Sequence, residues 1–159
     1  MTTKNKKSNK KKVEPIEETK SEFITVTNSY IMNLLDPNNT LFQELVKKEL
    51  PVKVSYWITR AITKMTGFMV DFESERTKIA EKFAKRDDDD EIIKVKGEDG
   101  RESLQIDNLE DFNVKFMELL NIEVDLGIKP IKYDVDNDNC MLSIQEMMLL
   151  MPLLEEIEE

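Results

Sequence analysis

The sequence contains no histidine, a single cysteine (Cys140) and only four glycines in 159 residues. One cysteine cannot form an intrachain disulfide, which argues against a secreted scaffold and for a reducing compartment. Cys140 also lacks the histidine that would activate it as a nucleophile, and no glycine-rich loop suited to a phosphate is present. The sequence therefore predicts no catalytic residue, no cofactor and no enzymatic activity.

Long hydrophobic runs are also missing. The longest, residues 144–154, is interrupted by Gln145 and Glu146, whereas a membrane-spanning helix needs about 20 apolar residues. Near the N-terminus, the segment Val13-Glu-Pro-Ile-Glu-Glu follows the lysines at the place where a secretion signal carries an apolar stretch. We therefore expect no contact with a membrane and no such signal.

The formal net charge of -10 is unevenly distributed along the chain. The first twenty residues carry seven lysines and three glutamates, which leaves 16 basic and 30 acidic side chains in the remainder. Such an acidic body is poorly suited to duplex DNA, whose binding depends on neutralising phosphates. The basic tail alone remains a candidate for contact with phosphate or with an acidic protein.

The size and composition of the chain fit one domain with one modest core, at 18.6 kDa and 40% hydrophobic residues. Residues 1–21 contain only scattered apolar side chains, so burial there cannot offset the entropy lost on ordering. The sequence predicts a disordered basic tail over residues 1–21 and a single helical α+β domain over residues 22–159.

The dominant pattern is a helical apolar repeat between Val52 and Arg86. Pro51 is well placed to open this helix, because a residue of the first turn needs no backbone donor. Gly67 lies within the repeat and costs about 1 kcal/mol relative to alanine. Trp57, Ile62 and Met69 widen the apolar face, which favours packing against several elements of the same chain over a bare coiled coil. The repeat itself comprises Val54, Ile58, Ala61, Met65, Phe68, Phe72, Ile79 and Phe83.

Short elements are predicted before the long helix. Residues 23–27 are rich in β-branched side chains and favour a strand, which residues 131–133 are expected to extend into a small sheet. Asn28 or Ser29 is predicted to cap a brief helix that ends at Leu35.

A second short helix is predicted from Thr40 to about Glu49. Thr40 and Gln43 have the spacing of a capping box, in which a hydroxyl and a glutamine side chain satisfy each other's backbone amides.

After the long helix the pattern changes to strict alternation. Residues 91–96 and 101–106 flank Gly97 and Gly100, whose tolerance of positive φ suits a tight turn, and this predicts a β-hairpin. The hairpin is expected to protrude as a tip that joins two antiparallel helices.

The second of these helices is predicted to start at Asp107 or Asn108 and to pack on the long helix. Its apolar face comprises Phe112, Phe116, Leu119 and Leu120. Residues 122–126 alternate like a half-buried strand. The predicted fold is therefore α+β and mainly α: a long helix packed antiparallel on a shorter one joined by a β-hairpin, with a small sheet and a C-terminal helix.

One stretch resembles a calcium-binding EF-hand loop, with carboxylates at Asp134, Asp136 and Asp138. Counting from Asp134, the sixth position lacks glycine and Glu146 arrives one residue late. Ser143 and Glu146 also have the spacing of a capping box for the last helix. We favour the capping interpretation, predict no metal site, and keep calcium as an alternative.

The C-terminal segment is apolar on every side of its helix, more than one core-facing side requires. Methionine-rich surfaces are adaptable and recur at protein interfaces. The predicted partner-binding residues are Met147, Met148, Met151 and Leu154. The alternative is a deeply buried terminal helix.

The order of these parts resembles small proteins of unknown function encoded by tailed bacteriophages. The matching segments are Leu50-Pro-Val-Lys-Val-Ser-Tyr56, Gly97-Glu-Asp-Gly100, Phe116-Met-Glu-Leu-Leu120, Ile122-Glu-Val-Asp125 and Leu142-Ser143. The resemblance covers residues 22–157 and implies a viral origin. The lysine-rich tail and the run of four aspartates are not part of it.

These observations lead to three functional hypotheses. The first is a non-enzymatic bacteriophage protein, a virion component or assembly factor, located in the virion or host cytoplasm. Its partners would be other phage proteins or further copies of the chain in a homo-oligomer. The second is an acidic anti-defence inhibitor that mimics nucleic acid, and the third is a calcium-stabilised regulatory module.

Overall fold

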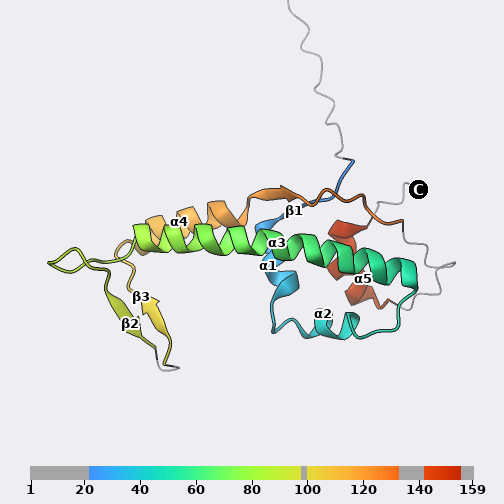
Figure 1. Cartoon of the computed structure of the whole chain (residues 1–159), viewed down its shortest axis with the longest axis horizontal. Coiled ribbons are helices and arrows are strands. Elements are labelled where there is room, and N and C mark those ends of the chain that lie inside the picture. Colours follow the sequence, from blue (N-terminus) through green and yellow to red (C-terminus); the bar gives the residue numbers. More distant parts are fainter. Residues whose placement is uncertain (1–21, 98–99, 133–141, 155–159) are drawn as a thin grey trace, which may run out of the picture.

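The computed structural model describes residues 22–97, 100–132 and 142–154. Figure 1 shows an elongated arrangement organised around one long helix, α3. The chain is α+β and mainly α, as the sequence predicts. Its elements are β1 (Thr25–Thr27), α1 (Asn28–Leu35), α2 (Thr40–Leu45), α3 (Val52–Lys82), β2 (Lys94–Lys96), β3 (Glu102–Leu104), α4 (Leu109–Leu120), β4 (Glu123–Asp125), α5 (Ile144–Leu150) and a 3-10 turn (Met151–Leu153).

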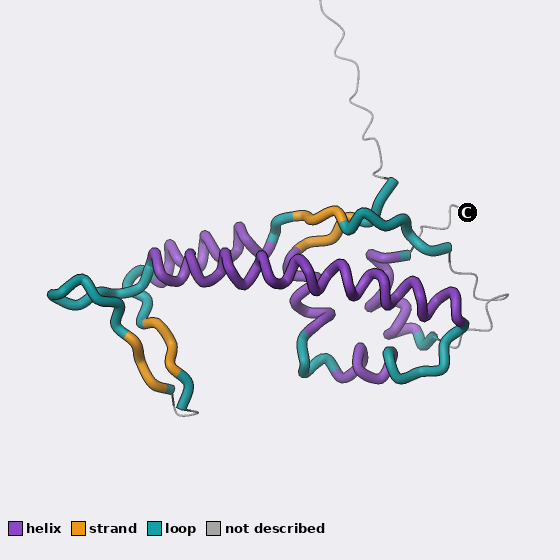
Figure 2. The backbone as a smooth tube through the Cα atoms, viewed as in Figure 1, coloured by secondary structure: helices purple, strands orange, loops and turns teal. Residues whose placement is uncertain are grey.

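Two regions lie along α3. We call residues 22–70, 121–132 and 142–154 the head, and residues 71–97 and 100–120 the arm. In the head, α1, α2, α5 and the β1–β4 sheet surround the first half of α3, whereas α4 covers its second half in the arm (Figure 1). Figure 2 shows the β2–β3 hairpin projecting away from the helices at the end of the arm, which confirms the predicted tip.

The predicted basic tail, residues 1–21, lies outside the described residues. None of the described helices is long and apolar enough to cross a bilayer.

The head is held together by a single hydrophobic cluster. Its helices contribute one apolar face each, and β1 and β4 contribute alternate side chains. The predicted repeat of α3 supplies the central row, although Phe68 is only partly buried. The fully or nearly buried members are Ile24, Val26, Ile31, Leu34, Phe42, Leu45, Val54, Ile58, Ala61, Met65, Leu126, Ile128, Ile131, Leu150 and Leu153.

The arm has a separate aromatic cluster. Phe112 and Phe116 of α4 stack with ring centroids 5.9 Å apart. Phe116 contacts Phe72 at 6.3 Å, and Phe112 contacts Phe83 edge-on at 6.5 Å. These pairings run in opposite directions along the two helices, so α4 packs antiparallel on α3 as predicted.

The base of the hairpin is fixed by three backbone segments that meet in a closed ring of hydrogen bonds. The Lys85 amide donates to the Gln105 carbonyl (2.7 Å), the Gln105 amide to the Ile93 carbonyl (3.0 Å), and the Ile93 amide to the Lys85 carbonyl (2.8 Å). An isolated two-stranded hairpin is marginally stable in water. The ring explains how this one keeps its place at the end of α3.

Two predicted helix caps are wrong because neighbouring side chains take over their roles. Thr27, not Asn28 or Ser29, caps α1 by accepting from the Tyr30 amide. Asn28 is buried instead, and its Nδ2 donates to the Leu119 carbonyl across the fold at 2.9 Å.

The capping box predicted for α2 is also wrong. Asn39 is the cap, since its side chain accepts from the Phe42 amide, and Thr40 is the first helical residue. The Gln43 side chain donates to the Pro37 carbonyl, not to a cap amide. The helix ends at Leu45, four residues before the predicted end at Glu49.

The predicted pairing of residues 131–133 with the first strand is wrong as well. β1 pairs antiparallel with β4, with Val26 opposite Val124. The ladder continues beyond β4, because the Leu126 amide donates to the Ile24 carbonyl and the Ile24 amide to the Ile128 carbonyl. Ile131 forms a parallel bridge with Leu154 instead, and Tyr133 lies outside the described residues.

Candidate partner-binding surface

The C-terminal helix α5 begins with the predicted capping box. The Ser143 hydroxyl accepts from the Glu146 amide at 3.2 Å, and the Ser143 amide donates to the Glu146 carboxylate at 2.6 Å. Two amides of the first turn that have no partner within the helix are thereby satisfied. The box sets where α5 starts and how it enters the head.

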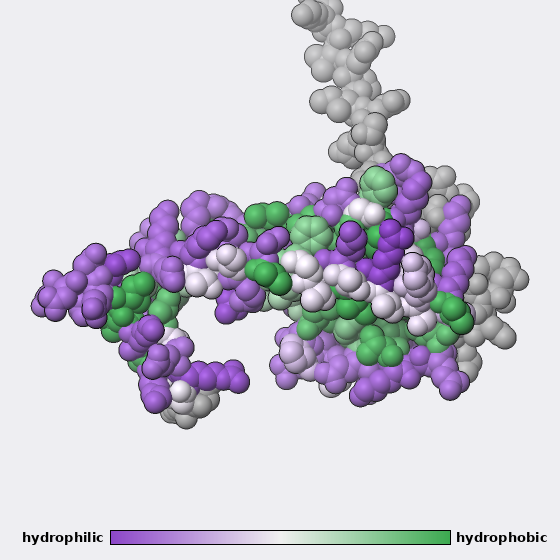
Figure 3. All heavy atoms as spheres, viewed as in Figure 1, coloured by the Kyte–Doolittle hydropathy of each residue, from purple (hydrophilic) through white to green (hydrophobic). Residues whose placement is uncertain are grey.

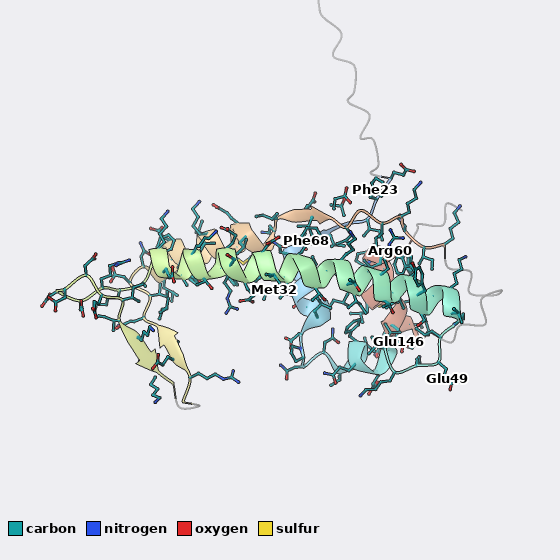
Figure 4. All side chains as sticks on the ribbon, viewed as in Figure 1. Phe23, Met32, Glu49, Arg60, Phe68 and Glu146 are labelled. Atoms are coloured by element: carbon teal, nitrogen blue, oxygen red, sulfur yellow. The ribbon has the colours of Figure 1, made fainter. Side chains whose placement is uncertain are left out.

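Glu146 also ties α5 to the segment after α2. The Lys48 ammonium donates to its carboxylate at 2.5 Å, and Figure 4 shows Glu146 between α5 and α2. The Glu146 side chain is almost fully buried. Burial raises the pKa of Glu146, but hydrogen bonds from Lys48 and from the Ser143 amide and hydroxyl outweigh it, so the pKa lies below its ordinary value.

The inner face of α5 and of the following turn is packed into the head. Leu150 and Leu153 are buried, and Met147 and Leu154 are partly buried against the same cluster. The Tyr30 hydroxyl of α1 donates to the Leu149 carbonyl at 2.9 Å. Burial raises the pKa of the Tyr30 hydroxyl, so this donor stays protonated.

The outer face presents three large apolar side chains to solvent, and we call them the outer stripe. Ile144, Met148 and Met151 are 74%, 64% and 63% exposed. Their spacing of four and then three residues places them on one side of the helix. Because the opposite face is anchored by the capping box, Lys48 and Tyr30, the outer stripe is displayed on a fixed support.

The structure therefore divides the four predicted partner-binding residues. Met148 and Met151 point outward, whereas Met147 and Leu154 face the core. Ile144 joins the outer stripe and was missed by the sequence prediction, although its helical spacing from Met148 was the signal that could have found it.

The alternative calcium site would need the Glu146 carboxylate as its bidentate ligand. The Glu146 carboxylate is engaged by Lys48 and Ser143, which leaves it badly placed for bidentate coordination. Asp134, Asp136 and Asp138 lie outside the described residues. Within the described ranges, no group of three or more acidic or cysteine side chains is arranged to hold a metal ion.

Comparison with known proteins adds no relative. No family model matches the chain, and neither a curated protein nor a solved structure matches it.

Proposed function

We propose that this protein acts without catalysis, by binding another protein through the outer stripe of Ile144, Met148 and Met151. The exposure of all three side chains on one anchored helix face carries the proposal. Large apolar groups at helical spacing fit an apolar groove, and flexible methionines adapt to its shape. Burial of such anchors is the main source of affinity at protein interfaces.

The setting proposed for this association is a bacteriophage, with the protein as a virion component or assembly factor in the virion or host cytoplasm. It is supported by the sequence segments that follow one another in the same order as in small phage proteins. The partner would then be another virion or assembly protein that exposes an apolar groove.

An acidic anti-defence inhibitor is the second candidate, favoured by the charge of the arm. Residues 71–120 carry sixteen acidic and nine basic side chains, whereas residues 22–70 carry four and five. However, Glu73, Glu75 and Glu118 each pair with a nearby cation, so the arm does not present an unbroken row of free carboxylates. The outer stripe is therefore the better supported surface.

The proposal is tested by capture on tagged full-length protein, with purified phage particles and host lysate offered separately. Met148→Glu and Met151→Glu should each weaken capture of the specific partner by at least about tenfold, since losing an interface anchor costs more than 1 kcal/mol. Met117→Glu on α4 is a matched control, because Met117 is also exposed, at 54%. Circular dichroism on each sample verifies the fold.

Equal capture by all folded variants would remove the outer stripe as the binding surface. Capture of a host nucleic-acid-binding protein would favour the second candidate.

A further inference from the structure

The face of α3 that points away from the core is free of charge over most of its length. Its residues are all exposed, and none of them is charged, although 35% of the residues in the whole chain are charged. We call this surface the outer face of α3, and Figure 3 shows a band of pale and green residues along the helix. It comprises Val52, Tyr56, Thr59, Thr63, Thr66, Gly67, Val70, Ser74 and Thr77.

The threonine hydroxyls of this face are already satisfied within the helix. Thr59 donates to the Ser55 carbonyl, Thr63 to the Thr59 carbonyl and Thr66 to the Ile62 carbonyl, all at 2.8–2.9 Å. Thr77 makes the same contact with Glu73. Since these four donors are used internally, covering the face leaves no threonine hydroxyl hydrogen without a partner.

Gly67 lies near the middle of the outer face, and no packing contact among the described residues requires a glycine there. A Cβ built there meets no atom within 4 Å, and its φ is that of an ordinary helix. Glycine weakens a helix relative to alanine and allows another backbone to approach closely. No described residue makes such an approach, which leaves the surface at Gly67 open to a second chain.

Charge is segregated along the flank of the outer face. Between Leu50 and Val70 there are three cations, Lys53, Arg60 and Lys64, and no acidic residue, and Asp71 follows at once. Arg60 and Asp71 are eleven residues apart, about three turns, so they lie on the same side of α3. Within the described residues neither makes an ion pair, and Figure 4 shows Arg60 on the head portion of α3.

We propose that the outer face of α3 binds the same face of a second copy of this chain, with the two helices antiparallel. A two-fold axis midway between residues 65 and 66 places Arg60 opposite the partner's Asp71, and Asp71 opposite the partner's Arg60. Gly67 then lies close to the point where the two helices meet. The described residues of the head carry seven acidic and seven basic side chains, and in this arrangement they face the acidic arm of the other copy. A parallel pair would instead place the two acidic arms against each other.

A shallow groove extends the same surface beside the first half of α3. Its lining comprises Val46, Lys48, Leu50, Ser55, Ile58 and Ile62, together with Thr59 and Thr63 of the outer face. Covering it would add apolar area at the edge of the interface.

Sedimentation equilibrium of the full chain tests the proposal, because a dimer has twice the monomer mass of 18.6 kDa. Arg60→Asp and Asp71→Arg should each weaken self-association more than tenfold, since each places like charges opposite one another. The double variant Arg60→Asp/Asp71→Arg should restore it to within a few fold of wild type. Lys96→Asp, the same charge change at an exposed residue of the hairpin strand β2, should have no such effect.

Gly67→Ala provides a second readout. It should raise the melting temperature of dilute protein, because alanine favours the helix, and yet weaken the dimer. A wild-type protein that stays monomeric up to its solubility limit would overturn the proposal. So would a double variant no better than its folded parents. Met148→Glu should leave self-association intact, so this test is independent of the outer stripe.

Discussion

The Lys48 ammonium and the Glu146 carboxylate meet at 2.5 Å although 98 residues separate them in the sequence. The contact joins the segment after α2 to the first turn of α5. It also accounts for a carboxylate that is 3% exposed, since burial of an ionised group is tolerated when it is paired and hydrogen-bonded. The helix that carries the outer stripe is thus anchored by an ion pair and a capping box at the same residue.

Glu146→Gln should lower the free energy of unfolding at neutral pH by about 1–2 kcal/mol, because a charge-assisted hydrogen bond is lost and Lys48 is partly exposed. The lowered pKa of Glu146 adds a pH dependence. Its stabilising contribution is complete above the unfolded-state pKa of about 4.3. It is lost as the pH falls through the lower pKa of the folded state. Urea unfolding at pH 7 and pH 3 should show a smaller difference for the variant than for wild type. The same difference in both proteins would contradict this role.

Phe116→Ala should loosen the arm, because Phe116 stacks on Phe112 and contacts Phe72. Truncation of a fully buried phenylalanine costs about 3–5 kcal/mol, and about 2–3 kcal/mol is expected for this partly buried ring. Hydrogen exchange should accelerate in α4 before it does in the head. Val114→Ala, on the exposed side of the same helix, should change stability by less than about 0.5 kcal/mol.

Phe68→Ala should destabilise the head by about 2–3 kcal/mol, less than the full cost of a buried phenylalanine, since Phe68 packs at the edge of the main cluster. Met65→Ala, at a fully buried position of the same helix, should cost more. The denaturant midpoints of the two variants, measured under the same conditions, show which substitution destabilises the protein more. A Phe68 variant that unfolds at the wild-type midpoint would mean that the ring adds nothing to the core.

Calorimetric titration should show no saturable binding of calcium at micromolar concentration, because Glu146 is committed to Lys48 and Ser143. One-site binding that disappears in Asp134→Ala would show that the segment can form a calcium loop despite these contacts.

Local patterns in the sequence were enough to predict the elements governed by local physics. The repeat from Val54 to Phe72 predicts α3, the glycines at 97 and 100 predict the hairpin, and Ser143 with Glu146 predicts the start of α5. The errors arise where distant residues compete for the same backbone groups. Asn28 could not be recognised as a buried residue bonded to Leu119, 91 positions away, and residues 126–128 take the edge of β1 that Ile131 was expected to occupy.

The candidate surface also depends partly on local sequence patterns and partly on contacts with distant residues. Composition alone indicates that the last helix is too apolar for one core face, but it does not say which side turns outward. That depends on the contacts of Tyr30 and Lys48 with α5, which come from distant parts of the chain. Once the inward side is known, helical spacing assigns Ile144, Met148 and Met151 to solvent.

Hydrogen exchange of α5, measured with and without the captured partner, shows whether the outer stripe is the binding surface. If it is, binding slows exchange in residues 143–154, and the Met148→Glu variant, mixed with partner at the same concentration, shows no such slowing. Protection of the arm or the hairpin on binding, with α5 unchanged, would contradict this assignment.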